Sequence, residues 1–229
     1  MTPLSQNILE TYQHRKTKKQ KFLFISLLKQ HFPQLQVQES PKCRNVILGD
    51  IENAQIVLAA YYNTCPLHSV SANHSGIVIL CELLCTLTGA QRAKAAFVFI
   101  DRKGAGLSYF RSQYKEQLAD KLLVSFDCVS NGDTILIAAT KQARAAMGDV
   151  IKCSFPQAES KAVLLAKAEK FNHIVSQTGF QKAITVVALR PRRYIGYYVD
   201  RFRTNTDTEF DKENIKLICD GILNLLKSL

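Results

Sequence analysis

The residues best suited to bind a metal lie between positions 65 and 81. Cys65, His68, His74 and Cys81 offer two thiols and two imidazoles in the spacing C-x2-H-x5-H-x6-C. Structural zinc sites use these ligand types, but not in this spacing. A thiol nucleophile at Cys65 would also need an acid to orient its histidine, and the sequence identifies none. We therefore expect Cys65 and His68 to be ordinary loop residues and Cys81 to lie inside a helix, with a substitute zinc site as the alternative.

The predicted strands and helices that must position these residues alternate along the chain. Apolar, β-rich runs predict strands at 45–49, 56–62, 95–100, 121–127, 134–139 and 183–189, with the first two paired in a hairpin. Helical spacing predicts two short helices or one broken helix within 5–32, and further helices at 77–88, 105–119, 141–150, 158–173 and 211–228. This alternation predicts an α/β fold, a three-layer αβα sandwich with a mixed, mostly parallel sheet. We expect one domain over 1–229, with the helical segment 1–40 packed on it.

Four segments follow predicted strands and should lie together. In open α/β sheets, ligands bind beyond the carboxyl ends of the strands. The segments to compare with known sites are therefore 61–76, 101–106, 127–132 and 190–208.

These segments resemble the motifs of the dinuclear zinc aminopeptidases, a zinc-exopeptidase family whose fold extends to the transferrin receptor ectodomain. The family's first strand ends in His-Tyr-Asp-Thr, whose His binds zinc and whose Asp orients that ligand; here the sequence is Tyr61-Tyr62-Asn63-Thr64. In the family, an Asp that bridges both metals precedes Asn-x-Ser-Gly; here Ala72 precedes Asn73-His74-Ser75-Gly76. The resemblance covers residues 44–228 and implies the zinc-exopeptidase fold.

The later motifs depart from the family in the same way. Its Asp-x-Glu-Glu-x-Gly-Leu motif supplies a general base and a zinc ligand, and here those two positions hold Lys103 and Gly104. The Asp that ends a later strand is retained as Asp127, and Arg203 stands where the final His would be. Of the five former metal positions, only Asp127 keeps a ligand; the others are Tyr61, Ala72, Gly104 and Arg203.

The resemblance therefore implies the zinc-exopeptidase fold without the zinc-dependent catalysis of the family. The former metal and base positions sum to a net charge of +1, and protonated Lys and Arg cannot bind a metal ion. We expect no catalytic residue, since Lys103 and Asn63 occupy the catalytic family positions, and no zinc cofactor. The expected function is a catalytically inactive binding or interaction protein that uses the former substrate cleft or a basic surface. The alternative is an aminopeptidase-type hydrolase with an unconventional metal or nucleophile site.

The same substitutions suggest a site for an anion. Lys103 or Arg203 could pair with Asp127 where a metal stood, or the cluster could bind a peptide carboxylate, a phosphate or a nucleic-acid strand. The residues of this candidate ligand site are Lys103, Arg203, Arg192, Arg193 and Asn73. Loop arginines that face solvent are the alternative.

Charge and cysteine content bound the partners and the compartment. The net charge is +11, and one basic run spans Arg15 to Lys21. We expect this run to be a solvated helix face, with nucleic acid or anionic lipid as weaker alternatives, because no aromatic residues are interleaved with it. The seven cysteines are scattered, and neither a signal peptide nor a membrane span is apparent. We therefore expect a cytoplasmic protein with reduced thiols.

Overall fold

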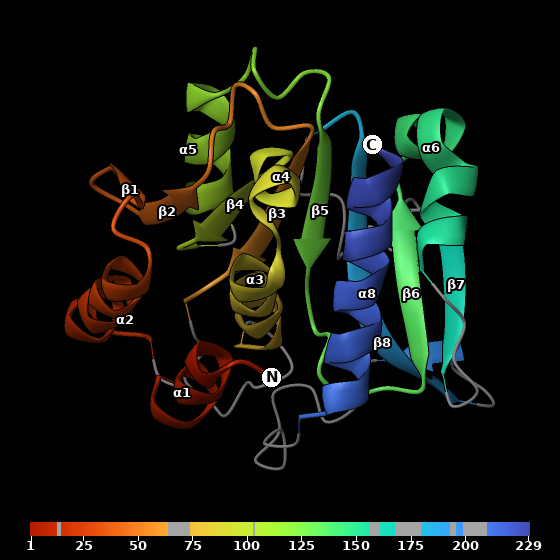
Figure 1. The fold of residues 1–229 in the computed structure, drawn as a ribbon, viewed down its shortest axis with the longest axis horizontal. Coiled ribbons are helices and arrows are strands. Elements are labelled where there is room, and N and C mark those ends of the chain that lie inside the picture. Colours follow the sequence, from red (N-terminus) through yellow and green to blue (C-terminus); the bar gives the residue numbers. More distant parts are fainter. Residues whose placement is uncertain are drawn as a thin grey trace.

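The centre of the protein is a mixed β-sheet, seen in a computed structural model that describes residues 1–12, 15–63, 74–102, 104–155, 161–167, 180–192, 196–198 and 210–229 (Figure 1). The strands are β1 (Gln36–Glu39), β2 (Arg44–Leu48), β3 (Ile56–Tyr61), β4 (Ala95–Ile100), β5 (Leu122–Phe126), β6 (Thr134–Ala139), β7 (Ala162–Lys167), β8 (Ala183–Arg192) and β9 (Gly196–Tyr198). Their order is β1-β2-β4-β3-β5-β8-β6-β7, and β9 pairs with β8.

The middle of the sheet is parallel. β3 pairs in parallel with both β4 and β5, and β5 pairs in parallel with β8. β6 runs antiparallel to β8 and parallel to β7. The carboxyl ends of β3, β4, β5 and β8 therefore meet at one edge of the sheet, whereas those of β6 and β7 lie at the opposite edge.

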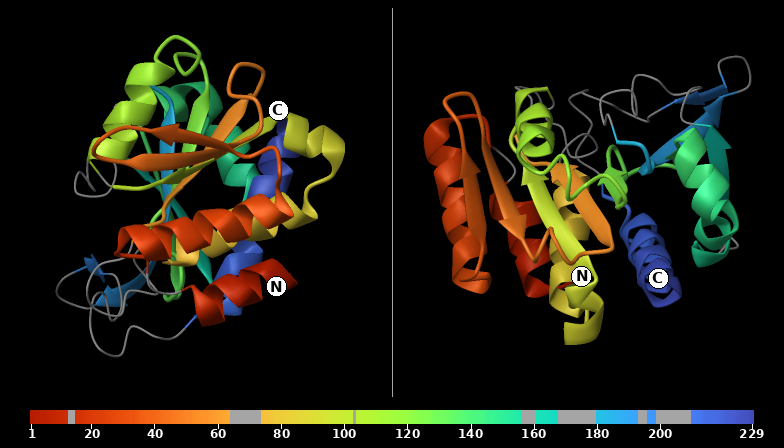
Figure 2. Two further views of the ribbon diagram at one scale, coloured as in Figure 1. Left: turned by 90° about the vertical axis from the view of Figure 1, so that its left-hand side faces the viewer. Right: turned by 90° about the horizontal axis from the view of Figure 1, so that it is seen from above.

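The helices that the structure describes cover both faces of this sheet. They are α1 (Pro3–Thr11), α2 (Lys18–His31), α3 (Ser75–Thr86), α4 (Gly89–Ala93), α5 (Ala105–Gln113), α6 (Lys141–Ser154) and α8 (Lys212–Ser228). Figure 2 shows α5 on one side of the sheet and α1, α2, α3 and α8 on the other. The expected α/β architecture is thus confirmed, and segment 5–32 holds the end of α1 and α2 as two separate helices.

Alternation of side chains along the strands gives the described residues three apolar clusters, of which the smallest contains Cys128, Leu136, Val187 and Leu189. On the side of α1, α2, α3, α6 and α8, the core contains Phe24, Leu58, Tyr62, Phe97 and Ile218, all fully buried. On the side of α5, a smaller core contains Val57, Val98 and Phe110. Within the described residues, no helix is long and apolar enough to cross a membrane.

The expected hairpin between 45–49 and 56–62 is wrong. β2 pairs antiparallel with β1 and β4, and β4 lies between β2 and β3. β4 is buried along its whole length, so pairing with β3 and β2 satisfies both of its edges. Gly49, at φ +91°, carries the chain past the start of β4; a Cβ there would lie 2.8 Å from the Ala95 carbonyl oxygen.

The helix expected at 158–173 is also wrong where the structure describes it, because residues 162–167 form β7. Five of the six residues in AVLLAK favour helices locally, Val163 being the exception. In the protein it pairs with β6 over six residues, from Thr134↔Ala162 to Ala139↔Lys167. The backbone hydrogen bonds offered by the edge of β6 thus override local propensity.

Candidate functional site

The carboxyl ends of β3, β4 and β5 bring together three of the predicted motif segments. Tyr61 ends β3, Asp101 follows β4 and Asp127 follows β5. The parallel pairing of β3 with both neighbours aligns these ends. The structure therefore places Tyr61 and Asp127 at adjacent strand ends, as the motif comparison predicts.

Tyr61 stands where a zinc-ligating imidazole is expected from the resemblance. Its ring packs against the apolar core on the α5 side. Burial, and then the negative charge of Asp127, raise the pKa of the Tyr61 hydroxyl well above its ordinary value of 10.0. The phenol therefore stays protonated at neutral pH, and a protonated phenol is a poor metal ligand.

Asp127 is half-buried just beyond β5. Its backbone N–H donates to the Val186 carbonyl at 3.1 Å, and its carboxylate Oδ1 accepts from the Cys128 thiol at 3.2 Å. Cys128 has a φ of 54°, in the left-handed region, which turns the chain sharply after the strand. A carboxylate is thus present at the position that the resemblance aligns with a zinc ligand.

Gly104 is the residue before α5 and has no side chain with which to bind a metal. A Cβ built at Gly104 would meet no atom of the described residues within 4 Å. Asn63, the counterpart of the orienting Asp, is half-buried two residues after β3. Neither residue can replace the imidazole and carboxylate ligands of a zinc centre.

The remaining predicted site residues lie outside the described residues: Ala72, Asn73, Lys103, Arg193, Arg203 and the side chain of Arg192. The ion pair between Asp127 and Lys103 or Arg203, and the anion site of these residues, therefore stay predictions. Cys65 and His68 are likewise outside the described part of the chain.

The two described members of the substitute zinc site are held by other contacts. The His74 ring is buried, and its Nδ1 accepts a hydrogen bond from Arg15 Nη1 at 3.0 Å. Cys81 is fully buried within α3, and burial raises the pKa of its thiol well above the ordinary value. Across the described residues, no group of three or more His, Cys, Asp or Glu side chains could hold a metal ion. A dication beside His74 would also meet the Arg15 guanidinium.

Arg15 is the main site residue that the sequence did not reveal. Expected on a solvated helix face, it is instead fully buried before α2, because its guanidinium has polar partners in the interior. Nε donates to the Tyr62 carbonyl at 2.7 Å, Nη1 donates to the Tyr12 carbonyl, and the guanidinium lies 5.3 Å from the centre of the Phe24 ring. Burial lowers the Arg15 pKa from 12.5 to about 9, so the side chain remains charged at neutral pH.

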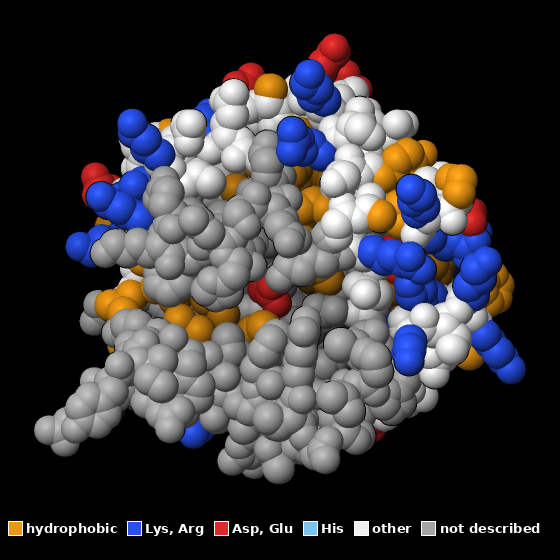
Figure 3. Space-filling view, turned by 180° about the vertical axis from the view of Figure 1, so that it is seen from behind, with side chains coloured by type: hydrophobic (Ala, Val, Ile, Leu, Met, Phe, Trp, Pro, Cys, Tyr) orange, Lys and Arg blue, Asp and Glu red, His pale blue; other side chains and the backbone are white. Residues whose placement is uncertain are grey.

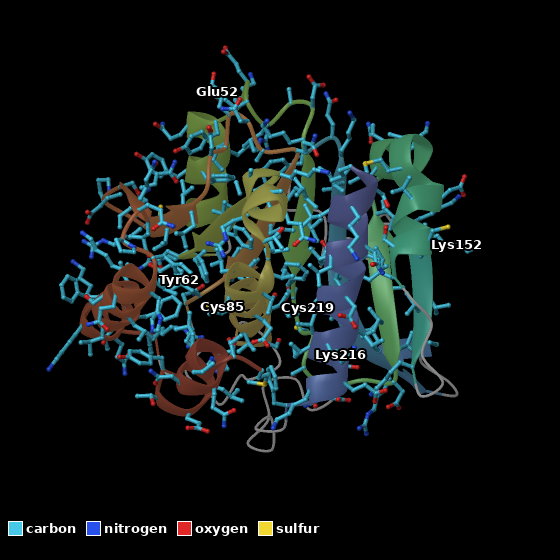
Figure 4. All side chains as sticks on the ribbon, in the orientation of Figure 1. Glu52, Tyr62, Cys85, Lys152, Lys216 and Cys219 are labelled. Atoms are coloured by element: carbon cyan, nitrogen blue, oxygen red, sulfur yellow. The ribbon has the colours of Figure 1, made fainter. Side chains whose placement is uncertain are left out.

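A second polar cluster surrounds Asp101, the first residue of the Asp-x-Glu-Glu-like segment. Its carboxylate is buried, pairs with Lys21 and accepts the Arg44 N–H at 3.1 Å. Its own N–H donates to Asn45 Oδ1 at 3.1 Å. Tyr62 lies beside this cluster and donates from its hydroxyl to the Arg44 carbonyl at 2.5 Å (Figure 4). The contacts join α2, β2 and the end of β4.

A hollow of about 580 Å³ opens next to this cluster. We call it the α2 pocket; it lies between α2, the turn 40–43 that joins β1 to β2, and residues 101–102 after β4. Seven Lys and Arg side chains line it, against the carboxylates of Glu39 and Asp101. Figure 3 shows Lys and Arg side chains gathered on the right, where α2 and the β1–β2 hairpin lie.

Comparison with known proteins identifies the fold. No protein-family model matches the chain, and no curated protein matches its sequence. Among solved structures, the glutaminyl cyclase of Tannerella forsythia is similar with a TM-score of 0.69 and 15% identity, over 98% of this chain and 97% of that one. The LapA aminopeptidase of Legionella pneumophila has a TM-score of 0.68 and 14% identity, over 99% of this chain and 69% of its own.

The zinc aminopeptidase BSAP of Bacillus subtilis has a TM-score of 0.61 and 13% identity, and this chain covers only 50% of its length. At these identities, the similarity establishes a common fold and no more. The zinc-exopeptidase-like fold expected from the motifs is therefore confirmed.

Proposed function

We propose that this chain is a non-catalytic binding protein built on the fold of zinc aminopeptidases and glutaminyl cyclases. The observation that carries the proposal is the set of side chains at the carboxyl ends of β3 and β5 and at the start of α5. The motif comparison aligns Tyr61, Asp127 and Gly104 with three metal positions; Tyr61 keeps its proton because burial raises the pKa of its hydroxyl, Gly104 has no side chain, and only Asp127 has a side chain suited to bind a metal.

The residues present do not fit a dinuclear zinc centre. Catalytic zinc requires about three protein ligands with N, O or S donor atoms. Ala72 has no donor atom in its side chain, and Arg203 is a protonated cation. The general-base position holds Lys103 in place of a carboxylate, so nothing there would take a proton from a metal-bound water.

The α2 pocket supports a binding role. It is a concave surface next to the former site, it carries an excess of positive charge, and the chain as a whole has a net charge of +11. Such a surface attracts acidic ligands and accelerates their association. Binding of an acidic ligand at this surface would not require any zinc-binding side chain.

Metal analysis combined with activity assays tests this proposal. The protein is incubated with excess zinc, freed of unbound ion, and measured for bound zinc, aminopeptidase activity and glutaminyl cyclase activity. We expect zinc well below one ion per chain, no thermal stabilisation by zinc, and neither activity.

One or two tightly bound zinc ions with peptidase or cyclase activity, both lost in Asp127→Ala, would overturn the proposal in favour of an unconventional hydrolase. Asp133→Ala is the matched control, because Asp133 is an exposed carboxylate six residues away that pairs only loosely, at 3.9 Å, with Arg190.

A further inference from the structure

Most of the positive side chains that line the α2 pocket have no acidic partner among the described residues of the protein. Lys21 pairs with Asp101, and Arg44 pairs with Glu39. Within the described part of the chain, the other five cations form no ion pair; they are Lys16, Lys18, Lys19, Lys42 and Arg102, all exposed. The described residues of the lining carry a net charge of +5. Like charges around one hollow repel each other, and a bound anion would relieve that repulsion.

The lysines of α2 also oppose the stability of the helix on which they lie. Lys18, Lys19 and Lys21 occupy its first turn, which contains no acidic residue. The amino end of a helix is the positive end of its dipole, so each exposed cation there destabilises the helix. The same end attracts anions through its dipole and unpaired N–H groups. This placement is unfavourable for an empty helix and favourable for one that meets an anion.

The walls of the pocket are fixed before any ligand arrives. Phe24 and Leu28 bury one side of α2 in the core, and Thr17 and Gln20 cap its start reciprocally. In the facing turn, Ser40 Oγ accepts the N–H of Cys43 at 3.1 Å, and the Ser40 N–H donates to the Cys43 carbonyl at 2.8 Å. The cations therefore extend from backbones that need no rearrangement, which lowers the entropic cost of binding.

Size and composition indicate the chemical class of the ligand. A volume of about 580 Å³ lies in the range of small-molecule sites. A net charge of +5 exceeds what one carboxylate could balance and suits a chain of phosphates, for which Lys is a common ligand. Phe22 lines the same hollow and is 59% exposed, so its ring offers a surface on which a base can stack.

We infer that the α2 pocket binds a nucleoside polyphosphate, with the phosphates on its unpaired cations and the base on Phe22. This inference names the ligand class of the binding protein proposed above and rests on that proposal.

Calorimetry with ATP, inorganic tripolyphosphate and adenosine tests the inference. We expect ATP to bind more tightly than tripolyphosphate, adenosine not to bind, and both phosphate affinities to fall at high salt. Lys18→Glu/Lys19→Glu should weaken ATP binding by at least about tenfold, the equivalent of about 1.4 kcal/mol. Phe22→Ala should lower ATP affinity to that of tripolyphosphate and leave tripolyphosphate binding unchanged.

Two measurements separate lost binding from lost folding. The Glu substitutions place acidic residues at a helix start, so the thermal midpoint of Lys18→Glu/Lys19→Glu should equal or exceed that of the unmodified chain. Lys141→Glu/Lys152→Glu makes the same charge change on α6, with Lys141 also in a first helical turn, at the opposite end of the sheet (Figure 4). This control should bind ATP normally.

Equal loss of binding in the control variant would overturn the inference, because it would show attraction to net charge alone. Binding of a single-stranded oligonucleotide or polyglutamate without binding of ATP would overturn the ligand class. In a zinc-free, inactive chain, failure of both ATP and tripolyphosphate to bind would overturn this inference and leave the proposed function standing. A zinc-loaded, active chain would overturn the proposed function whatever the ATP result.

Discussion

Gly76→Ala tests whether close packing explains the glycine of the Asn-x-Ser-Gly-like segment. Gly76 lies in the first turn of α3, where the helix approaches the sheet closely. A Cβ there would lie 2.7 Å from the Phe126 carbonyl oxygen, 3.1 Å from the Ala60 Cβ and 3.3 Å from the Phe126 Cβ. The nearest of these atoms belongs to the backbone of β5, a strand paired on both edges, so α3 must move instead.

The magnitude follows from two opposing effects. A methyl group forced against a backbone carbonyl belongs at the upper end of the overpacking penalty, about 3 kcal/mol. The better helix propensity of Ala returns about 1 kcal/mol. We therefore expect Gly76→Ala to lower the free energy of unfolding by about 2 kcal/mol.

Gly148→Ala is the matched control. Gly148 lies inside α6, and a Cβ there would meet no atom within 4 Å. The same substitution should therefore raise the free energy of unfolding by about 0.5–1 kcal/mol. Urea denaturation followed by circular dichroism measures both variants, with unchanged m-values expected. A Gly76→Ala variant as stable as the unmodified chain would refute the packing argument, and the segment would then need a functional explanation.

Two further predictions concern buried charge and buried thiols. Asp211→Ala removes the N-cap of α8 and the partner of the buried Lys161, so it should lower the free energy of unfolding, measured by urea titration, by about 2–3 kcal/mol. Asp211→Asn should lower it by less, because Asn keeps the cap. Asp220→Ala, which breaks an exposed pair with Lys216, should leave the free energy of unfolding nearly unchanged, and a loss comparable to that of Asp211→Ala would contradict the burial argument. Burial raises the pKa values of Cys81 and Cys219 above 9.0, so unfolded thiols lose protons above pH 9.0 while folded ones keep them. The stabilising contribution of these two thiols should therefore be full below about pH 9 and be lost as the pH rises. The difference in stability between the unmodified chain and Cys81→Ala/Cys219→Ala should then change above about pH 9, whereas the difference from Cys153→Ala, whose thiol is exposed, should stay constant; parallel pH curves for all three would refute this.

The sequence predicts the central strands well because their apolar runs are bounded clearly. β4 and β6 have the predicted limits, 95–100 and 134–139, and both are buried throughout. The pairing of β2 could not be predicted in the same way, since the partner of a strand is set by contacts far apart in the chain. β7 illustrates the same limit, because its residues favour a helix until the edge of β6 is available.

In the candidate site too, some residues could be predicted from the sequence and others could not. The positions of Tyr61, Gly104 and Asp127 could be predicted because Tyr61 ends a strand, Asp127 follows one and Gly104 directly precedes a helix. The α2 pocket could not be predicted, because Lys42 and Arg102 join the lysines of α2 only through the tertiary fold. The basic run also gives no sign that Arg15 is buried, since its carbonyl and imidazole partners come from residues 12, 62 and 74.

The position of β8 between β5 and β6 has a consequence for how the chain reaches its fold. β6 follows β5 after a short connection and runs antiparallel to it, yet a space must stay open between them for β8. About sixty residues separate β5 from β8, which a ribosome takes several seconds to add at about 5–20 residues per second. During that interval β5 and β6 can pair directly as a hairpin, which forms far faster, in about 1–10 μs. We expect that premature hairpin to be the main kinetic trap, and its opening to admit β8 to limit the rate of folding.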